Sequence, residues 1–253
     1  MKRGMKKFFY GLFYLGIFTL FCLLIYNSFI KPAPTCFDGI KNQNEQDVDC
    51  GGPCVPCEIL HLKPLKANEP QLFSLADGKL AILTEIFNPN EGYGADQFSY
   101  QINLYDRNHR LIKTIKGSDF IFDLSRRYIF ASDPFLGSLA VEAEISLGSP
   151  IWKSNKEMLR PDLRLSSQKT EITPSGIETS GRIYNGSILA ASEVKILAIL
   201  KDKFGRPLFV GQTFLAKVES LKESDFMVIF PQDKFLEQNV DVSQTQIFLS
   251  GRL

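Results

Sequence analysis

Four cysteines and a set of oxygen-bearing side chains crowd into residues 36–57, and these are the residues best suited to do chemistry. The cysteines are Cys36, Cys50, Cys54 and Cys57, and the oxygen donors are Asp38, Asn42, Asn44, Glu45, Asp47 and Asp49. Thiols form disulfides or hold zinc, whereas carboxylate and amide oxygens suit a hard cation such as Ca²⁺. The segment is therefore a candidate for a crosslinked module, a metal site, or both.

In an oxidising compartment the four cysteines would form two disulfides, with three pairings that the sequence does not separate. The segment has few aliphatic side chains, namely Ile40, Val48 and Val55. Each crosslink typically adds about 2 to 4 kcal/mol by restricting the unfolded chain. We therefore expect the disulfides to supply much of the order in this module.

The oxygen donors of the same module suggest calcium as a cofactor, and Gly51 and Gly52 would allow the tight turn of a binding loop. The spacing departs from that of an EF-hand loop, which has Gly at its sixth position and Glu at its twelfth. We expect first a solvated acidic turn held by disulfides, and second a calcium site. Zinc held by four thiolates ranks below both, because these thiols would oxidise.

The rest of the chain offers little chemistry. Of its two histidines, His61 follows the cysteine module and His109 lies in a predicted turn with Asp106, and we expect both to be exposed loop residues. Gly-x-Ser-x-Gly, His-Glu-x-x-His and a glycine-rich phosphate loop are missing. The sequence Asn185-Gly186-Ser187 matches a glycosylation acceptor, but we expect Asn185 to serve as a turn residue. We predict a protein that is not an enzyme.

An uncharged apolar run over residues 8–30 predicts a membrane-spanning helix. At about 1.5 Å per residue it would be roughly 34 Å long, enough to cross a hydrocarbon core of about 30 Å. Lys2, Arg3, Lys6 and Lys7 precede it, so residues 1–7 are expected to form a cytoplasmic stub, with the C-terminal domains extracytoplasmic. The alternative is a cleaved signal peptide, whose apolar core is about 7 to 15 residues, shorter than this run.

The charge balance excludes one class of partner. The chain has 29 Lys and Arg against 28 Asp and Glu, and four of the basic residues lie in the stub. The remainder is slightly acidic and lacks the basic surface that nucleic acid requires. We expect the membrane, and a protein of the cell envelope, as partners.

Beyond Cys57 the apolar residues alternate, which predicts β-strands. Phe98, Tyr100, Ile102 and Leu104 alternate with polar residues, and residues 141–147 do the same. Residues 194–200 are apolar except for Lys195, which predicts a strand covered on both faces. We expect no long amphipathic helix outside the anchor.

The strands recur as an internal repeat. The sequence Ile86-Phe87-Asn88 matches Ile183-Tyr184-Asn185, and Leu104-Tyr105-Asp106 matches Leu200-Lys201-Asp202. We predict a mainly β protein with one N-terminal transmembrane helix, a disulfide-rich module at 31–60, and two tandem Ig-like or fibronectin-like β-sandwiches at 61–157 and 158–253. Each sandwich should hold some seven short strands.

The pattern Cys-x-Asp-Gly-x-x-Asn-x-x-Glu-x-x-x-Asp-Cys-Gly-Gly-x-Cys-x-x-Cys over residues 36–57 resembles short cysteine-rich repeats of bacterial surface proteins. The Leu104-Tyr105-Asp106 strand end resembles sandwiches of the FxLYD type, with Ile102 in place of the preferred Phe and Lys201 in place of the Tyr in the second copy. The Asn88-Pro89-Asn90 segment is similar to the late-embryogenesis-abundant (WHy) sandwiches. These resemblances imply structural or binding modules on a bacterial cell surface, without catalysis.

Together these features predict a single-pass, plasma-membrane-anchored scaffold or protein-interaction protein of the cell envelope. Exposed sheet edges and loops would supply its binding surface. The alternative is an adhesin or ligand-binding receptor whose cysteine-rich module is stiffened by calcium. A hydrolase with an unrecognised site ranks third, because the chain has no histidine-centred constellation.

Overall fold

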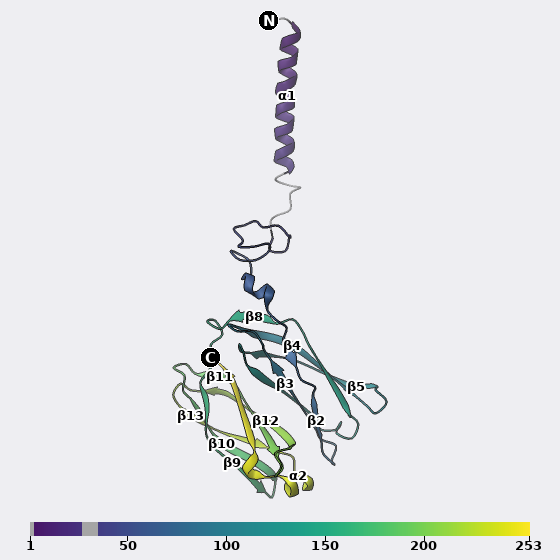
Figure 1. The fold of residues 1–253 in the computed structure, drawn as a ribbon, viewed down its shortest axis with the longest axis vertical. Helices are drawn as coiled ribbons and strands as arrows, with labels where there is room; N and C mark the ends of the chain where they lie inside the picture. Colours follow the sequence, from purple (N-terminus) through teal and green to yellow (C-terminus); the bar gives the residue numbers. More distant parts are fainter. Residues whose placement is uncertain (1–2, 27–34) are drawn as a thin grey trace. The chain divides into compact units, whose positions relative to one another are not determined.

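The computed structural model describes residues 3–26 and 35–253, with side chains described from Phe8 onward. The chain divides into two compact units, Met1–Leu62 and Lys63–Leu253, which are described separately. Figure 1 shows a long helix near the N-terminus and β-sheets in the second unit. The chain is mainly β, as the alternating pattern predicts.

The first unit begins with helix α1 (Arg3–Ile25). Its apolar side chains are exposed from Phe8 onward, and Phe8–Ile25 is the one stretch among the described residues that is long and apolar enough to cross a membrane. A membrane anchor and a signal sequence both fit this helix. The predicted continuation to Ile30 lies outside the described residues.

The cysteine module consists of turns, followed by the 3₁₀ helix η2 (Cys57–His61). Disulfides join Cys36 to Cys54 and Cys50 to Cys57. This is one of the three pairings that the sequence left open. Cys50 is almost fully buried, so the crosslinks themselves form the centre of a module that has little apolar core.

The second unit contains two sandwiches, each built from two antiparallel sheets. In sandwich 1, one sheet holds β1 (Lys66–Ala67), β2 (Gln71–Ser74), β3 (Leu80–Phe87) and β6 (Arg126–Asp133), and the other holds β4 (Tyr93–Tyr105), β5 (Leu111–Ile121), β7 (Glu142–Leu147) and β8 (Ile151–Ser154). In sandwich 2, one sheet holds β9 (Leu163–Thr173), β10 (Gly176–Asn185) and β13 (Glu223–Ile229), and the other holds β11 (Ala191–Lys201), β12 (Pro207–Val218) and β14 (Gln246–Arg252).

Six strands of sandwich 1 pair in the same way as the six strands of sandwich 2, whereas β1 and β8 are additional strands of sandwich 1. β3 pairs with β2 and β6 as β10 pairs with β9 and β13, and β4 pairs with β5 and β7 as β11 pairs with β12 and β14. The sheets place the divide between the sandwiches at residues 155–162, between β8 and β9. Trp152 therefore belongs to β8 of sandwich 1 rather than to the connecting segment.

Sandwich 2 also contains two short elements that the sequence pattern did not predict. Helix α2 (Lys234–Asn239) begins after Asp233, whose carboxylate accepts the N–H groups of Phe235 and Leu236, and it buries Leu236. A 3₁₀ helix, η3 (Val242–Gln244), follows it. Helix α2 has six residues, too few for a helical period to appear in the sequence. Residues 35–253 contain no long helix, as expected.

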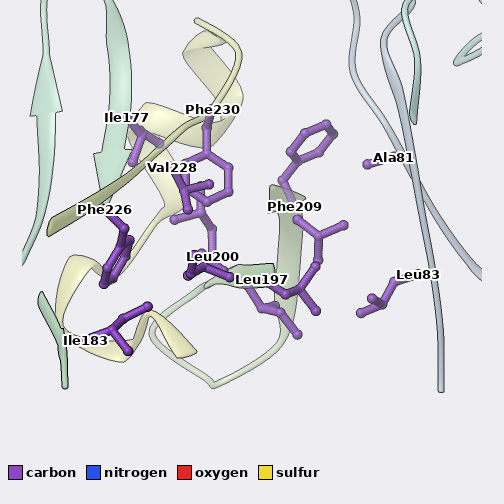
Figure 2. Packing of buried hydrophobic residues seen from close by; sticks show 14 of the residues in the cluster. Ala81, Leu83, Ile177, Ile183, Leu197, Leu200, Phe209, Phe226, Val228 and Phe230 are labelled. Carbon is purple, nitrogen blue, oxygen red and sulfur yellow. The ribbon is translucent and has the colours of Figure 1, made fainter. Parts of the chain in front are cut away.

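Strand β3 is buried on both faces. Leu80, Ile82 and Ile86 point into the core of sandwich 1, whereas Ala81 and Leu83 belong to the apolar cluster of sandwich 2. Figure 2 shows Ala81 and Leu83 facing that cluster from a neighbouring strand. Alternation along one strand therefore serves two cores at once.

Strand β11 is the matching strand in sandwich 2, and the prediction that residues 194–200 are covered on both faces is confirmed. Leu197 pairs with Phe248, and the ring of Phe248 lies 4.4 Å from that of Tyr128 on β6. Leu197 and its face of the sheet are therefore covered by sandwich 1. The two sandwiches share a continuous apolar junction.

Candidate functional site

The predicted ligand oxygens of the cysteine module are engaged by the module's own backbone. Asp49 accepts the N–H groups of Asp38 and Gly39. Asp38 accepts those of Thr35 and Ile40 and the side-chain amide of Asn42. The amide of Asn42, followed by the N–H of Thr35, lowers the pKa of Asp38 below 3.8. These carboxylates act as anchors for turns.

Glu45 has the same role at the centre of the module. It is 6% exposed, and its Oε2 accepts the N–H groups of Asn42 and Asp49. Its Oε1 lies 3.1 Å from Sγ of Cys54. That sulfur is bonded to Cys36 and carries no proton, so this is a close contact rather than a hydrogen bond.

Among the described residues, Cys36, Glu45 and Cys54 form the one group of three side chains with ligand atoms close enough to hold a metal. Both sulfurs of this group are consumed in one disulfide, so zinc through four thiolates does not fit the module. Asp47 contacts the N–H of Val48, and Asn44 has a left-handed backbone. Calcium at Asp38, Asn42, Asn44, Glu45, Asp47 and Asp49 remains a prediction.

The two histidines lie on the surface. His61 ends η2, and His109 sits in a turn with its Nδ1 2.8 Å from Oε2 of Glu142. The side chain of His109 is 81% exposed. An exposed pair of this kind contributes little to stability, about 0 to 1 kcal/mol.

Two buried asparagines have matching structural roles. The side-chain amide of Asn88 donates to the carbonyls of Tyr93 and Phe122, and its oxygen accepts the N–H of Asn90. The amide of Asn185 donates to Leu189 and Val218, and its oxygen accepts the N–H of Ser187. The hydrogen bonds confirm the predicted repeat. They also confirm Asn185 as a turn residue, since a fully buried amide offers no site for a glycan.

The aspartates that follow β4 and β11 match in the same way. Asp106 accepts the N–H groups of Asn108 and Arg110, and the Arg110 guanidinium closes the turn. Asp202 accepts those of Phe204 and Arg206, and Arg206 closes that turn. The matching Asp of each repeat is therefore explained by turn geometry.

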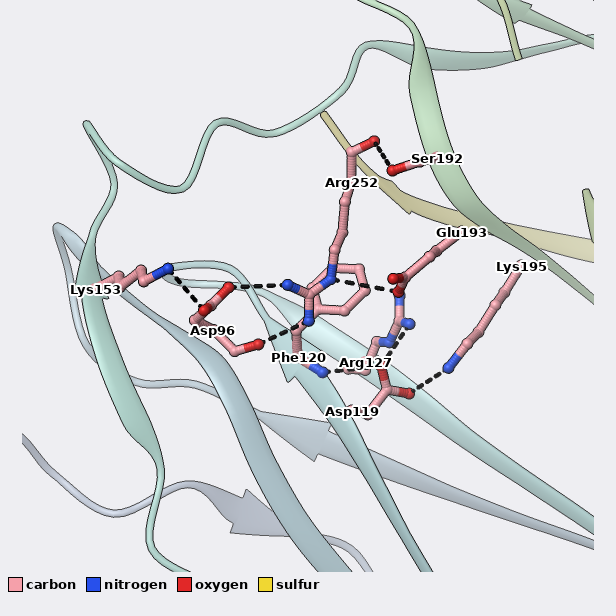
Figure 3. A network of polar contacts seen from close by, with 9 residues as sticks. All are labelled: Asp96, Asp119, Phe120, Arg127, Lys153, Ser192, Glu193, Lys195 and Arg252. Atoms are coloured by element: carbon pink, nitrogen blue, oxygen red, sulfur yellow. Dashed lines mark hydrogen bonds and ion pairs between the residues drawn. The ribbon is translucent and has the colours of Figure 1, made fainter. Parts of the chain in front are cut away.

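The junction of the two sandwiches gathers several charged side chains. On β5, Asp119 is buried and lies 2.7 Å from Nη2 of Arg127 and 2.9 Å from Nζ of Lys195. Lys195 comes from β11 of sandwich 2, so this carboxylate joins the two sandwiches. Figure 3 shows the three side chains meeting beside Phe120.

A second set of ion pairs lies on the other side of Phe120. Arg252, near the C-terminus, donates to Oδ1 and to the carbonyl of Asp96, and Lys153 lies 2.8 Å from Oδ2 of Asp96. The hydrogen bond from Lys153 lowers the pKa of Asp96, with Arg252 adding to the effect. The guanidinium carbons of Arg127 and Arg252 each lie 4.1 Å from the centre of the Phe120 ring (Figure 3).

Beside the apolar part of the junction, Tyr128 forms a hydrogen bond within sandwich 1. Tyr128 donates to Oε2 of Glu85 at 2.8 Å, and the guanidinium of Arg126 binds Oε1 of the same carboxylate. Burial, followed by the bond to Glu85, raises the pKa of Tyr128 to about 12. The phenol thus stays protonated and keeps donating across the physiological range.

The segment that connects the sandwiches is packed onto sandwich 1. Met158 is buried, and a Cβ at Gly94 would lie 2.7 Å from its sulfur and 3.0 Å from the carbonyl oxygen of Ile121, so a larger residue there would force these neighbours to shift. Arg160 donates to the carbonyl of Asp123, and Asn155 donates to the carboxylate of Asp123. A connector held this way does not act as a free hinge.

A cavity of about 210 Å³ opens at this connector. Its wall comes from the β5–β6 corner of sandwich 1, the connector, and the β9 and β14 strands of sandwich 2. Three arginines line it, namely Arg126, Arg127 and Arg160, and the lining contains no acidic residue. The remaining wall is largely apolar. This is the candidate binding site of the second unit.

The sequence pattern does not predict the junction or its cavity. The ion pairs across the sandwiches join residues far apart in the sequence. Lys195 is 76 positions from Asp119, and Arg252 is 156 positions from Asp96, and no motif links them. One signal was available. Leu197 and Ile199 on a strand covered on both faces require a second apolar partner, which is Leu83 and its neighbours.

Comparisons with known proteins do not place the chain in a family. No family model and no curated protein matches it. One similar solved structure is the C-terminal globular domain of an oligosaccharyltransferase from Pyrococcus abyssi, at 12% identity and a TM-score of 0.23, covering 75% of this chain and 46% of that one. This chain therefore spans less than half of that structure.

Another similar structure is the tandem CBM22-1–CBM22-2 domain of Xyn10C from Paenibacillus barcinonensis, at 8% identity and a TM-score of 0.15, covering 74% of this chain and 85% of that one. Likeness at this level carries no argument about function. The resemblances to cysteine-rich surface repeats and to FxLYD and WHy sandwiches therefore remain predictions.

Proposed function

We propose that the protein is a single-pass, membrane-anchored scaffold of the cell envelope that presents two joined β-sandwiches to a protein partner outside the cytosol. The observation that carries this proposal is the junction. Sandwich 2 contributes Lys195 and Arg252 to carboxylates of sandwich 1, and the apolar faces around Leu83 and Leu197 pack together. Two sandwiches held this firmly suit a spacer that keeps a binding surface in a set orientation.

Two further features support an extracytoplasmic position. Helix α1 carries an exposed apolar surface from Phe8 to Ile25, and two disulfides follow it. Disulfides persist mainly in oxidising compartments. A bacterial plasma membrane, with the N-terminus in the cytoplasm, is the setting that agrees with both features and with the basic residues before the helix.

Orientation is tested by adding protease to intact cells, with any outer envelope opened. We expect the second unit to be degraded while the N-terminal stub is protected. Survival of the second unit in intact cells, together with its loss after lysis, would place it in the cytosol and reject the proposal.

Partner binding is tested by crosslinking the membrane-bound chain and identifying attached proteins by mass spectrometry. A scaffold should yield the same few envelope proteins in repeated experiments. An exposed-surface variant, Arg182→Gln on β10, which removes one exposed ion pair with Glu223, serves as the control against which losses in other surface variants are compared. Recovery of the bare chain in every experiment would count against a protein-binding role.

A further inference from the structure

We propose that the cavity at the connector binds a small organic anion, namely a carboxylate carried on an apolar body. The proposal does not depend on the scaffold function. The argument begins with the composition of the wall. Arg126, Arg127 and Arg160 face the cavity without an acidic residue in the lining.

The three guanidinium groups have hydrogen-bonding capacity to spare. A guanidinium carries five N–H donors. Arg126 engages Glu85 through Nη1, Arg127 engages Asp119 through Nη2, and Arg160 engages Asp123 through Nη2. In the described part of the chain each group thus uses one terminal nitrogen. Further donors stay available at the cavity for an anion.

Arg127 gives the most direct sign of an absent partner. Its side chain is 4% exposed, and its Nε is buried without a hydrogen-bond partner among the described residues. A buried donor left unpaired is costly, and such groups in folded proteins call for an explanation. The cation also stacks on Phe120, which holds the guanidinium plane in place at the edge of the cavity.

The apolar part of the cavity wall favours an anion that carries an apolar body. Ile121, Phe122, Pro161, Leu163 and Leu249 supply an apolar surface, and Arg160 lies over the ring of Phe122. A bare inorganic anion would leave this surface uncovered, whereas a carboxylate with an aliphatic or aromatic body would fill it and pair with arginine bidentately. The body would contact both sandwiches and the connector at once.

The experiment titrates the full chain in detergent micelles with 3-phenylpropionate and, in parallel, with its neutral amide. We expect saturable calorimetric binding of the acid, at least about tenfold weaker binding of the amide, and a rise in unfolding temperature with the acid. Equal binding of the amide, or no saturable binding of the acid, would overturn the proposal. Inorganic phosphate bound as well as the acid would overturn the requirement for an apolar body.

Substitutions locate the site. Arg160→Gln, on the exposed connector, is expected to weaken binding of the acid about tenfold. Arg164→Gln is the matched control, because Arg164 is exposed, pairs with Asp162 and does not line the cavity. Unchanged affinity in Arg160→Gln, or an equal loss in Arg164→Gln, would rule out this cavity as the site.

A carboxylate of this kind can be a free small molecule or the C-terminus of a peptide. Acetyl-Gly-Gly-Phe, compared as its acid and its amide, distinguishes them. Tighter binding of the peptide acid than of phenylpropionate assigns the site to chain ends, and the reverse order assigns it to free acids. Discrimination between peptide acid and amide supports the proposal in either case.

Discussion

At the scale of single residues, this chain uses its polar side chains chiefly to organise its backbone. Asn88 and Asn185 each bind two carbonyls from separate strands or loops, and Asp106 and Asp202 each cap a turn. These residues define the repeat in the sequence. Their hydrogen bonds to the main chain give the structural reason for their matching positions.

We expect Asn185→Ala to destabilise the protein by about 2 to 4 kcal/mol, because each buried carbonyl left unpaired costs about 1 to 3 kcal/mol. Chemical denaturation of the full chain in detergent, followed by tryptophan fluorescence, measures the change. Asn239→Ala is the control, since Asn239 is exposed on α2 and bonds within its own turn. A loss in Asn185→Ala no larger than in the control would contradict this role.

At the scale of elements, the strands and turns could be predicted from the sequence. Which strands pair with each other, and which cysteines, could be predicted only in part. Alternation marked β4 and β7, and a nearly continuous apolar run marked β11. The Asn and Asp positions gave the order of the repeat. The disulfide pairing could not be predicted, because four cysteines within 22 positions permit several closures. Helix α2 was missed because its six residues give too few turns for a period to show.

The disulfides lead to a prediction about thiol labelling. Without reductant, alkylation in detergent should label Cys22, which is free and exposed on α1, and should leave Cys36, Cys50, Cys54 and Cys57 unmodified. After reduction all five should react. Peptide mapping by mass spectrometry reads out each position, and Cys22 serves as the internal positive control. Labelling of the four module cysteines before reduction would show that the crosslinks are absent from the native chain.

At the scale of the whole second unit, the decisive feature is the contact between sandwiches, which local sequence patterns do not reveal. An apolar face is readable on β11, but its partner on β3 lies more than 100 positions away. The ion pairs and the cavity form only when the sandwiches pack together, so local sequence patterns do not predict them either. The cysteine module was the opposite case, because its chemistry is local and its residues are consecutive.

We expect Leu197→Asp to destabilise the second unit by at least about 3 kcal/mol, since it places an unpaired carboxylate against Leu83 and Phe248. The repeat supplies the matched control. Gln101 occupies the equivalent position on β4, where the outer face is not covered by another sandwich, so Gln101→Asp should cost less than about 1 kcal/mol. Thermal unfolding of the full chain compares the two variants, and equal losses would contradict the described junction.

The β3 sheet of sandwich 1 contacts the β11 sheet of sandwich 2, so two non-equivalent sheets of the repeat meet. Such a head-to-tail contact can be repeated without limit by further copies. A second copy would bring the β10 sheet of one chain against the β4 sheet of another. Glu178 and Ser180 on β10 stand where the existing contact has Ala81 and Leu83. Gln101 and Asn103 on β4 stand where it has Leu197 and Ile199. Burying those four polar side chains would strip them of water with nothing apolar in return. The polar side chains at these four positions therefore disfavour the addition of a further copy to the pair.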